Sequence, residues 1–373
     1  MRARASRQLK ETTGGLSGRP GMAVPLALFI ALAVSAGSGL VAQTGPAPLL
    51  AAQQDTTPRS RVRLVSDVAS IRPGEPFTIG LHVTLHEGWR TPWKNAGDVG
   101  NGLIATWSLP SGFSADSFAW PVPERISNPP VASYGYHDEV VILATITPPA
   151  GLQPGRSVRL GLSADFVLCG HTCLPAHAER SLELPVRHAP PTPSGDAALI
   201  RRYADRLPVR HAQWTTRAAR TDSGFVVGVA PPAEWKGSLG GAWFFPAHPG
   251  VLDHAADQPI RRTAAGEYRV RLTRSAYLAG EPRRIEGILV LPDGNAFDAA
   301  GHRGLVVSAA VADANVAWAA EPTQPVAAPG QGATVGTAGG VTLLLAVLFA
   351  LAGGVILIPK IVLYVHNHEE KTT

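Results

Sequence analysis

Apolar and polar residues alternate along several short stretches of the chain, which is the pattern of half-buried β-strands. The alternation is regular over residues 77–85 and 158–168, whereas residues 140–146 form a continuous apolar run typical of a strand covered on both faces. Residues 182–186 add a further alternating run. Turn-forming segments rich in Gly and Pro separate these runs, so the pattern predicts an antiparallel β-sandwich over residues 60–188.

A second group of strand-like runs occupies residues 211–320. The candidate strands are residues 225–229, 268–272, 285–291 and 305–311. Between the two β regions, residues 189–210 predict a Pro-rich linker with a short helix over residues 196–207, whose N-cap lies near Ser194 or Asp196. The expected fold class is therefore all-β, with two tandem immunoglobulin-like β-sandwiches plus one C-terminal transmembrane helix.

The two ends of the chain carry the export and membrane signals. A basic segment, a short apolar run and small residues predict a signal peptide over residues 1–42. An uncharged apolar run that resumes after Lys360 predicts a transmembrane helix over residues 341–365, and a buried core helix is the alternative. Residues 43–59 and 321–340 are linkers rich in Pro and Ala.

The charge of the chain gives no reason to expect a nucleic-acid partner. The formal net charge is +5, but five of the 33 basic residues lie in the first 22 positions beside a single acid, so the remainder carries 28 bases and 27 acids. The sequence has no Gly-rich phosphate loop, no GxSxG and no HExxH. We therefore expect no cofactor and no metal site.

Cys169 and Cys173 are the only cysteines of the chain. The alternation directs Phe166 and Leu168 toward the core, so Cys169 is expected on the opposite face with Asp165, accessible to solvent or a partner. A structural disulfide is the usual role of paired cysteines in exported proteins. However, closing a loop of about five residues contributes only about 2 kcal/mol, against nearly 5 kcal/mol for a hundred-residue loop.

Two reactive roles for the cysteines are the alternatives to a structural disulfide. Thiol–disulfide exchange needs an accessible sulfur and a nearby thiol that resolves the mixed disulfide, and the CxxxC spacing supplies that thiol. His171 lies between the cysteines and would tune a thiol if it is protonated. Metal binding would combine both thiolates with His171 or His177 to hold Cu(I) or Zn(II), but the third ligand is doubtful.

Three stretches of the sequence, taken together, form a more specific motif around the cysteine pair than CxxxC alone. They are residues 88–100 (GWRTPWKNAGDVG), 133–140 (SYGYHDEV) and 166–175 (FVLCGHTCLP). Their order and spacing resemble the periplasmic N-terminal region of the DsbD/ScsB family of thiol:disulfide interchange proteins. In that family, an immunoglobulin-like domain receives electrons through its cysteine pair and passes them to oxidised disulfide isomerases, cytochrome c maturation factors or copper-tolerance proteins.

The resemblance implies roles for individual residues. Cys169 and Cys173 are the implied catalytic pair, with Cys173 attacking and Cys169 resolving. The residues expected to shield or tune the pair are His171, Tyr134, Tyr136, Trp93 and Asp165, with Trp89 and Phe166 as further aromatic candidates. Ordinary packing in the sandwich core is the alternative role for these aromatic residues.

Full members of the family continue into a multi-helix membrane domain with its own cysteines. Residues 348–357 look like the start of its first helix, but no membrane cysteine follows. We therefore expect a protein-disulfide reductase-like component, anchored by a single membrane pass at the periplasmic face of the bacterial inner membrane. It would depend on a separate membrane electron donor and act on periplasmic thiol/disulfide proteins. The alternatives are a membrane-tethered scaffold with a structural disulfide and a copper-binding, copper-tolerance protein.

Overall fold

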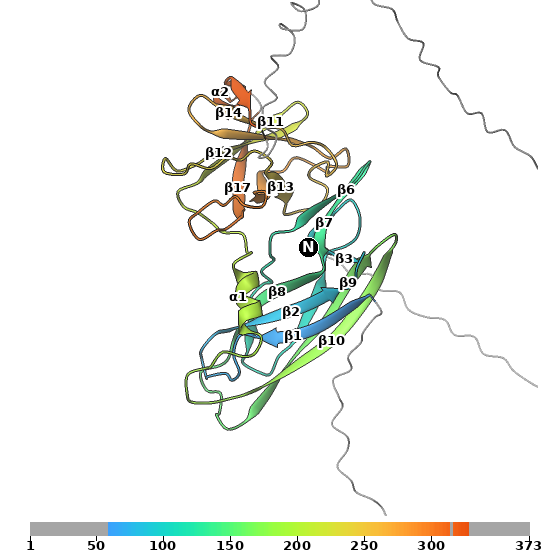
Figure 1. The fold of residues 1–373 in the computed structure, drawn as a ribbon, viewed down its shortest axis with the longest axis vertical. Helices are drawn as coiled ribbons and strands as arrows, with labels where there is room; N and C mark the ends of the chain where they lie inside the picture. The colour runs from blue at the N-terminus through green and yellow to red at the C-terminus, as the bar shows by residue number, and fades with distance from the viewer. Residues whose placement is uncertain (1–58, 314–315, 328–373) are drawn as a thin grey trace, which may run out of the picture. The chain divides into compact units, whose positions relative to one another are not determined.

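The computed structural model describes residues 59–313 and 316–327 (Figure 1). The predicted signal peptide and C-terminal transmembrane helix lie outside these ranges. Within them, no helix has the length and apolar character needed to cross a membrane. The described chain is mostly β-structure, as predicted, and its two helices are short, α1 (Ala197–Ala204) and α2 (Ala317–Ala320).

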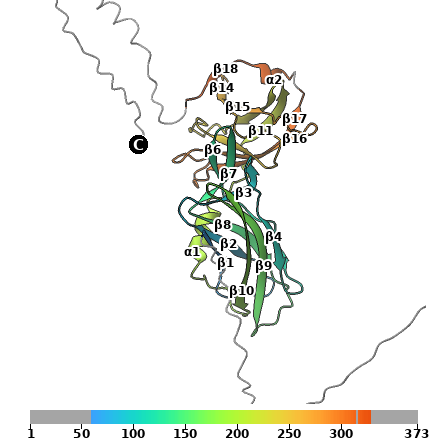
Figure 2. The same cartoon turned by 90° about the vertical axis from the view of Figure 1, so that its right-hand side faces the viewer.

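The first β region contains two sheets (Figures 1 and 2). One sheet has the order β1-β2-β8-β5, formed by β1 (Ser60–Ser66), β2 (Phe77–Leu85), β8 (Glu139–Thr147) and β5 (Ser114–Ala115). The other has the order β10-β9-β3-β7-β6, formed by β10 (Cys173–Pro185), β9 (Ser157–Cys169), β3 (Arg90–Gly97), β7 (Val131–His137) and β6 (Glu124–Asn128), with β4 (Ile104–Ser108) also paired to β9. All of these pairings are antiparallel.

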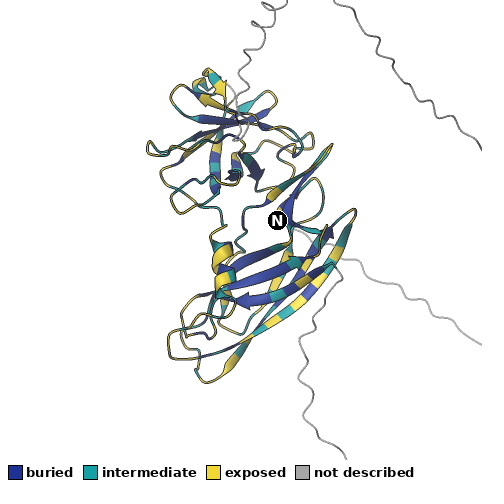
Figure 3. Ribbon diagram, in the orientation of Figure 1, coloured by how far each residue is buried: buried dark blue, intermediate teal, exposed yellow. Residues whose placement is uncertain are grey.

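The strands of the first region follow the hydrophobic pattern of the sequence. The continuous apolar run in β8 is buried on both faces, whereas β9 buries every second residue from Leu160 to Leu168 (Figure 3). In β10, most of the residues that lie on the same face of the sheet as Asp165 are exposed. The buried side chains of the two sheets form one hydrophobic core, so the strand periodicity itself decides which face of β9 carries Cys169.

The second β region is built on one eight-stranded sheet of order β13-β16-β17-β11-β12-β15-β14-β18. Its strands are β11 (Thr215–Thr221), β12 (Gly224–Ala230), β13 (Trp243–Pro246), β14 (Ile260–Thr263), β15 (Tyr268–Thr273), β16 (Arg284–Val290), β17 (Gly304–Ala312) and β18 (Thr323–Pro325). The pairing of β11 with β17 is parallel, and the other pairs are antiparallel. Buried aromatic residues such as Trp214, Phe225 and Phe297 give this region a hydrophobic core of its own.

Side chains of the second region also take part in the core of the first. Phe245 of β13 packs edge-on against Trp93 and Tyr134, with ring centroids 6.2 and 4.8 Å apart. The buried amide Nδ2 of Asn95 donates a hydrogen bond of 2.8 Å to the carbonyl oxygen of Pro246. The strands β3 and β7, which lie beside the cysteine pair, therefore pack against side chains of the second region and form a hydrogen bond with its backbone.

Helix α1 connects the two regions and is shorter than the predicted 196–207. Its N-terminus is preceded by Ser194, whose hydroxyl oxygen accepts a hydrogen bond from the Asp196 backbone amide. Its buried residue Tyr203 donates a hydrogen bond of 2.8 Å to the carbonyl oxygen of Glu139. This contact ties the helix to the start of β8.

Candidate functional site

The two cysteines lie at the turn of the β9–β10 hairpin. Cys169 is the last residue of β9, Cys173 is the first residue of β10, and the two face each other in the register and form a disulfide. Their exposure differs, because Cys169 is only 2% exposed whereas Cys173 is half-buried. The expectation that the whole face with Asp165 is accessible is therefore wrong for Cys169 and right for Asp165, which is exposed.

Cys169 is covered by the loop that follows β3, residues 98–103, called here the cover loop. Gly100 of this loop has φ +98°, a left-handed conformation that a side chain rarely adopts. A Cβ placed on Gly100 would lie 3.7 Å from Cys169 Sγ and 2.9 Å from Pro92 Cγ. The cover loop thus passes beside the buried sulfur, and its positive φ and its close approach to Pro92 are what favour glycine at this position.

The cover loop is anchored at Asp98. The Asp98 carboxylate accepts a hydrogen bond of 2.8 Å from the Ala132 amide, and the Asp98 amide donates one of 2.9 Å to the Ala132 carbonyl. Ala132 lies in β7 and is fully buried. The sequence motif at residues 97–100 marked this segment as a point of family resemblance, but nothing in it showed that the loop folds over a cysteine 69 positions later.

A small cavity of about 10 Å³ lies beside Cys169. It is lined by Arg90, Thr91, Pro92, Val99, Ile126, Ser133, Tyr134, Gly135 and Cys169. Arg90 stands directly opposite Cys169 in the β3–β9 pairing and opposite His137 in the β3–β7 pairing. Sequence analysis did not find Arg90, because its place beside Cys169 depends on a strand pairing between residues 79 positions apart.

The predicted aromatic residues lie mostly on the core side of the sheet. Tyr134 lines the cavity beside Cys169, and its hydroxyl is 3.0 Å from Nδ1 of the buried His254. Tyr136 donates a hydrogen bond of 2.7 Å to the Pro121 carbonyl, and Trp93 packs on Phe245. Burial raises the pKa of both tyrosines well above the ordinary value, so their hydroxyls stay protonated.

Trp89 and His171 lie at the turn that joins the cysteines. A Cβ added at Gly170 would lie 3.5 Å from the Trp89 indole, so this ring covers one side of the turn. The Arg59 guanidinium lies over the same indole, 4.9 Å from the ring centroid. His171 is exposed and has no hydrogen bond or ion pair with any residue of the described ranges.

The exposed face of the hairpin carries a charged group two rows from the disulfide. His177 lies opposite Asp165 in the register, with Nδ1 2.8 Å from the Asp165 carboxylate, and Nε2 is 3.7 Å from Glu179. The hydrogen bond to Asp165 raises the pKa of His177. Among the described residues, no three His, Cys, Asp or Glu side chains are grouped so that they could hold a metal ion.

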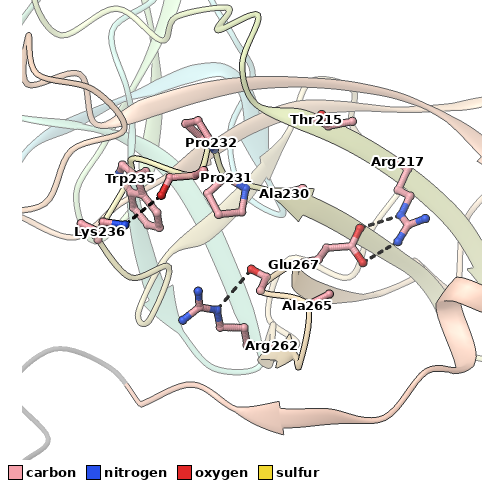
Figure 4. A pocket seen from close by; sticks show the side chains of 13 residues that line it. Thr215, Arg217, Ala230, Pro231, Pro232, Trp235, Lys236, Arg262, Ala265 and Glu267 are labelled. Atoms are coloured by element: carbon pink, nitrogen blue, oxygen red, sulfur yellow. Dashed lines mark hydrogen bonds and ion pairs between the residues drawn. The ribbon is translucent and has the colours of Figure 1, made fainter.

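A second and more open recess of about 620 Å³ lies in the second β region (Figure 4). Trp235, Lys236 and Arg262 line one part of it, and a two-bonded ion pair between Arg217 and Glu267, with distances of 2.7 Å, lines the other. The recess contains no cysteine. The one disulfide among the described residues is the one at the hairpin turn.

The comparisons with known proteins relate the first β region to one family. Residues 61–185 match the family model described as the N-terminal domain of the thiol:disulfide interchange protein DsbD. Among curated proteins, none matches the sequence.

The comparison with solved structures found similarity to two bacterial proteins. The N-terminal periplasmic domain of ScsB from Proteus mirabilis has 19% identity and a TM-score of 0.47, covering 68% of this chain and 94% of that one. A fragment of the major pilin GBS80 of Streptococcus agalactiae has 10% identity and a TM-score of 0.22, covering 67% of this chain and 90% of that one.

Proposed function

Residues 61–185 are a DsbD-type N-terminal domain, and from this premise we propose that the chain is a periplasmic thiol:disulfide interchange module. The observation that carries the proposal is the unequal exposure of a disulfide within one hairpin turn. Cys173 is half-buried, whereas Cys169 is buried under the cover loop. An incoming thiolate therefore has access to Cys173 and not to Cys169.

This asymmetry supports a particular order of exchange. The thiolate of a donor attacks Cys173 Sγ, the donor–Cys173 disulfide forms, and the Cys169–Cys173 bond breaks with its electron pair on Cys169 Sγ. The second thiolate of the donor then attacks the donor sulfur of the mixed disulfide, so that the disulfide of the donor forms and Cys173 leaves as a thiolate. Two electrons have moved to the pair, and Cys173 can attack the disulfide of an oxidised partner while Cys169 resolves it.

The remaining features of the proposal concern the setting of the domain. We infer that the chain works at the periplasmic face of the bacterial inner membrane, held by the apolar segment 341–365, and takes electrons from a separate membrane donor. The oxidised partners are periplasmic disulfide proteins. His171, Asp165 and the aromatic residues Tyr134, Tyr136 and Trp93 are proposed to shield or tune the pair, Tyr134 most directly because it lines the cavity beside Cys169.

Trapping of mixed disulfides tests the proposal. In full-length Cys169→Ser, the Cys173 thiol should attack an oxidised thioredoxin-like protein and remain joined to it, because the resolving sulfur is absent. Cys173→Ser is the matched control and should accumulate much less complex, since Cys169 is covered. If neither variant forms a complex and Cys173→Ser only lowers the stability of the protein, the disulfide is structural and the proposal is wrong.

A further inference from the structure

Opening of the disulfide places a charge at a buried position. When Cys173 is attacked, the electron pair of the broken bond remains on Cys169, whose residue is 2% exposed. Burial disfavours the charged form of a thiol, as it does that of any acid, unless a group of opposite charge lies close by. A cation beside Cys169 would therefore favour the exchange chemistry.

Arg90 fits this role. It is the one charged residue among those that line the cavity beside Cys169. Residues directly opposite each other in an antiparallel pair have Cβ atoms about 4.5–5.5 Å apart and point to the same face of the sheet, and Arg90 is the opposite residue of Cys169. Its guanidinium has no ion pair or hydrogen bond with another residue of the described chain, so its charge is free for Cys169.

The other charged groups near the cysteine pair do not line the cavity beside Cys169, which leaves Arg90 as the partner of its thiolate. His137, on the far side of Arg90, lies 2.9 Å from Glu124, and the Asp165–His177 pair lies two rows further along β9 and β10. The Asp98 carboxylate of the cover loop is engaged by the Ala132 amide. His171 is in the exposed turn. None of these groups lines the cavity beside Cys169.

We propose that Arg90 is the charge partner of Cys169 and stabilises the thiolate that leaves when Cys173 is attacked. The role rests on the proposed function of the cysteine pair and deepens it, because it assigns the residue that makes a buried sulfur an efficient leaving group. A thiol that ionises more readily leaves faster in exchange. An opposite charge within about 4–6 Å shifts such an ionisation by about one to three pH units.

The test compares three variants of the full chain. Arg90→Gln removes the charge, and Arg90→Lys keeps it. Arg159→Gln removes an exposed charge from β9, the strand of Cys169, ten residues or about 33 Å from Cys169. The first measurement is the rate of disulfide reduction by a reduced thioredoxin from pH 6 to 9. The second is the midpoint of thiolate absorbance of Cys169 in the Cys173→Ser background.

Arg90→Gln should slow reduction at pH 7 about three- to tenfold and raise the thiolate midpoint by about one pH unit or more. Arg90→Lys should restore most of the reduction rate and most of the thiolate midpoint. The reduction rate of Arg159→Gln should stay within about twofold of that of the parent. A purely structural role for Arg90 would leave the midpoint unchanged. If Arg90→Gln does not fold, Arg90→Met, which keeps the apolar stem of the side chain, replaces it.

The outcomes separate this inference from the proposed function. Exchange with thioredoxin that is equally fast in Arg90→Gln and in the parent overturns the role of Arg90 and leaves the exchange function in place. A parent protein that is not reduced by thioredoxin at any pH overturns the exchange function itself, whatever the thiolate midpoint of Cys169.

Discussion

The cover loop should open more often when its anchor at Asp98 is removed. In Asp98→Ala, the amide of the buried Ala132 loses its 2.8 Å acceptor. Hydrogen bonds to charged groups contribute about 1.5–3 kcal/mol, and Asp98 is exposed, so we take the lower value of about 1.5 kcal/mol. Because about 1.4 kcal/mol corresponds to a tenfold change in an equilibrium constant, the open population should rise about tenfold.

The reactivity of Cys169 reports this opening directly. In the Cys173→Ser background, Cys169 is the only thiol of the chain, and a reagent such as DTNB can reach it only when the loop moves. Asp98→Ala should then raise the rate of modification about tenfold. Asp98→Asn keeps an acceptor oxygen and should raise the rate less, and Asp222→Ala, an exposed aspartate elsewhere, should leave it unchanged.

The reasoning would be refuted by one combination of results. If hydrogen exchange shows that the Ala132 amide has lost its protection in Asp98→Ala, but DTNB modifies Cys169 at the parental rate, the loop does not control access to the sulfur. Circular dichroism of each variant distinguishes this outcome from general unfolding.

Two further predictions concern the packing behind the site. Phe245→Ala should lower the free energy of unfolding by about 3–5 kcal/mol, because its buried ring packs on Trp93 and Tyr134, whereas Tyr277→Ala, at a side chain 92% exposed, should stay within about 0.5 kcal/mol in denaturant titration. Burial lowers the pKa of His254, so the unfolded chain binds its proton at a higher pH than the folded chain. The stability that the neutral His254 contributes is therefore fully present above about pH 6.5 and is lost as the pH falls below that value. The His254→Gln variant should lose less stability than the parent between pH 7 and 5, and an unchanged pH dependence would contradict this.

The hydrophobic pattern predicted the strands whose residues alternate regularly or form a continuous apolar run. The alternation over residues 77–85 corresponds to β2, and the continuous run at 140–146 lies within β8. The strands β3 and β7 escaped prediction, since their segments contain Pro92 or Gly135 and have no regular alternation. The extended conformation of such strands is determined by pairing with neighbouring strands rather than by their own hydrophobic pattern.

The same limit applies to the candidate site. Periodicity placed Cys169 on the correct face of β9, opposite the core residues Phe166 and Leu168. Its burial could not be predicted, because it arises from Gly100 of a loop far away in the sequence, and Arg90 reaches the cysteine through strand register. Both contacts depend on the tertiary fold, and a single sequence contains no local signal for either.

The reduction potential of the Cys169–Cys173 pair tests the central claim most directly. Equilibration of the full chain with glutathione and with a thioredoxin-like donor gives the potential. An exchange module should lie above about −300 mV, within the range in which thioredoxin-like donors reduce disulfides. A pair below about −300 mV that stays oxidised in the presence of a reduced donor would show that the disulfide is a structural bond, and would contradict the account.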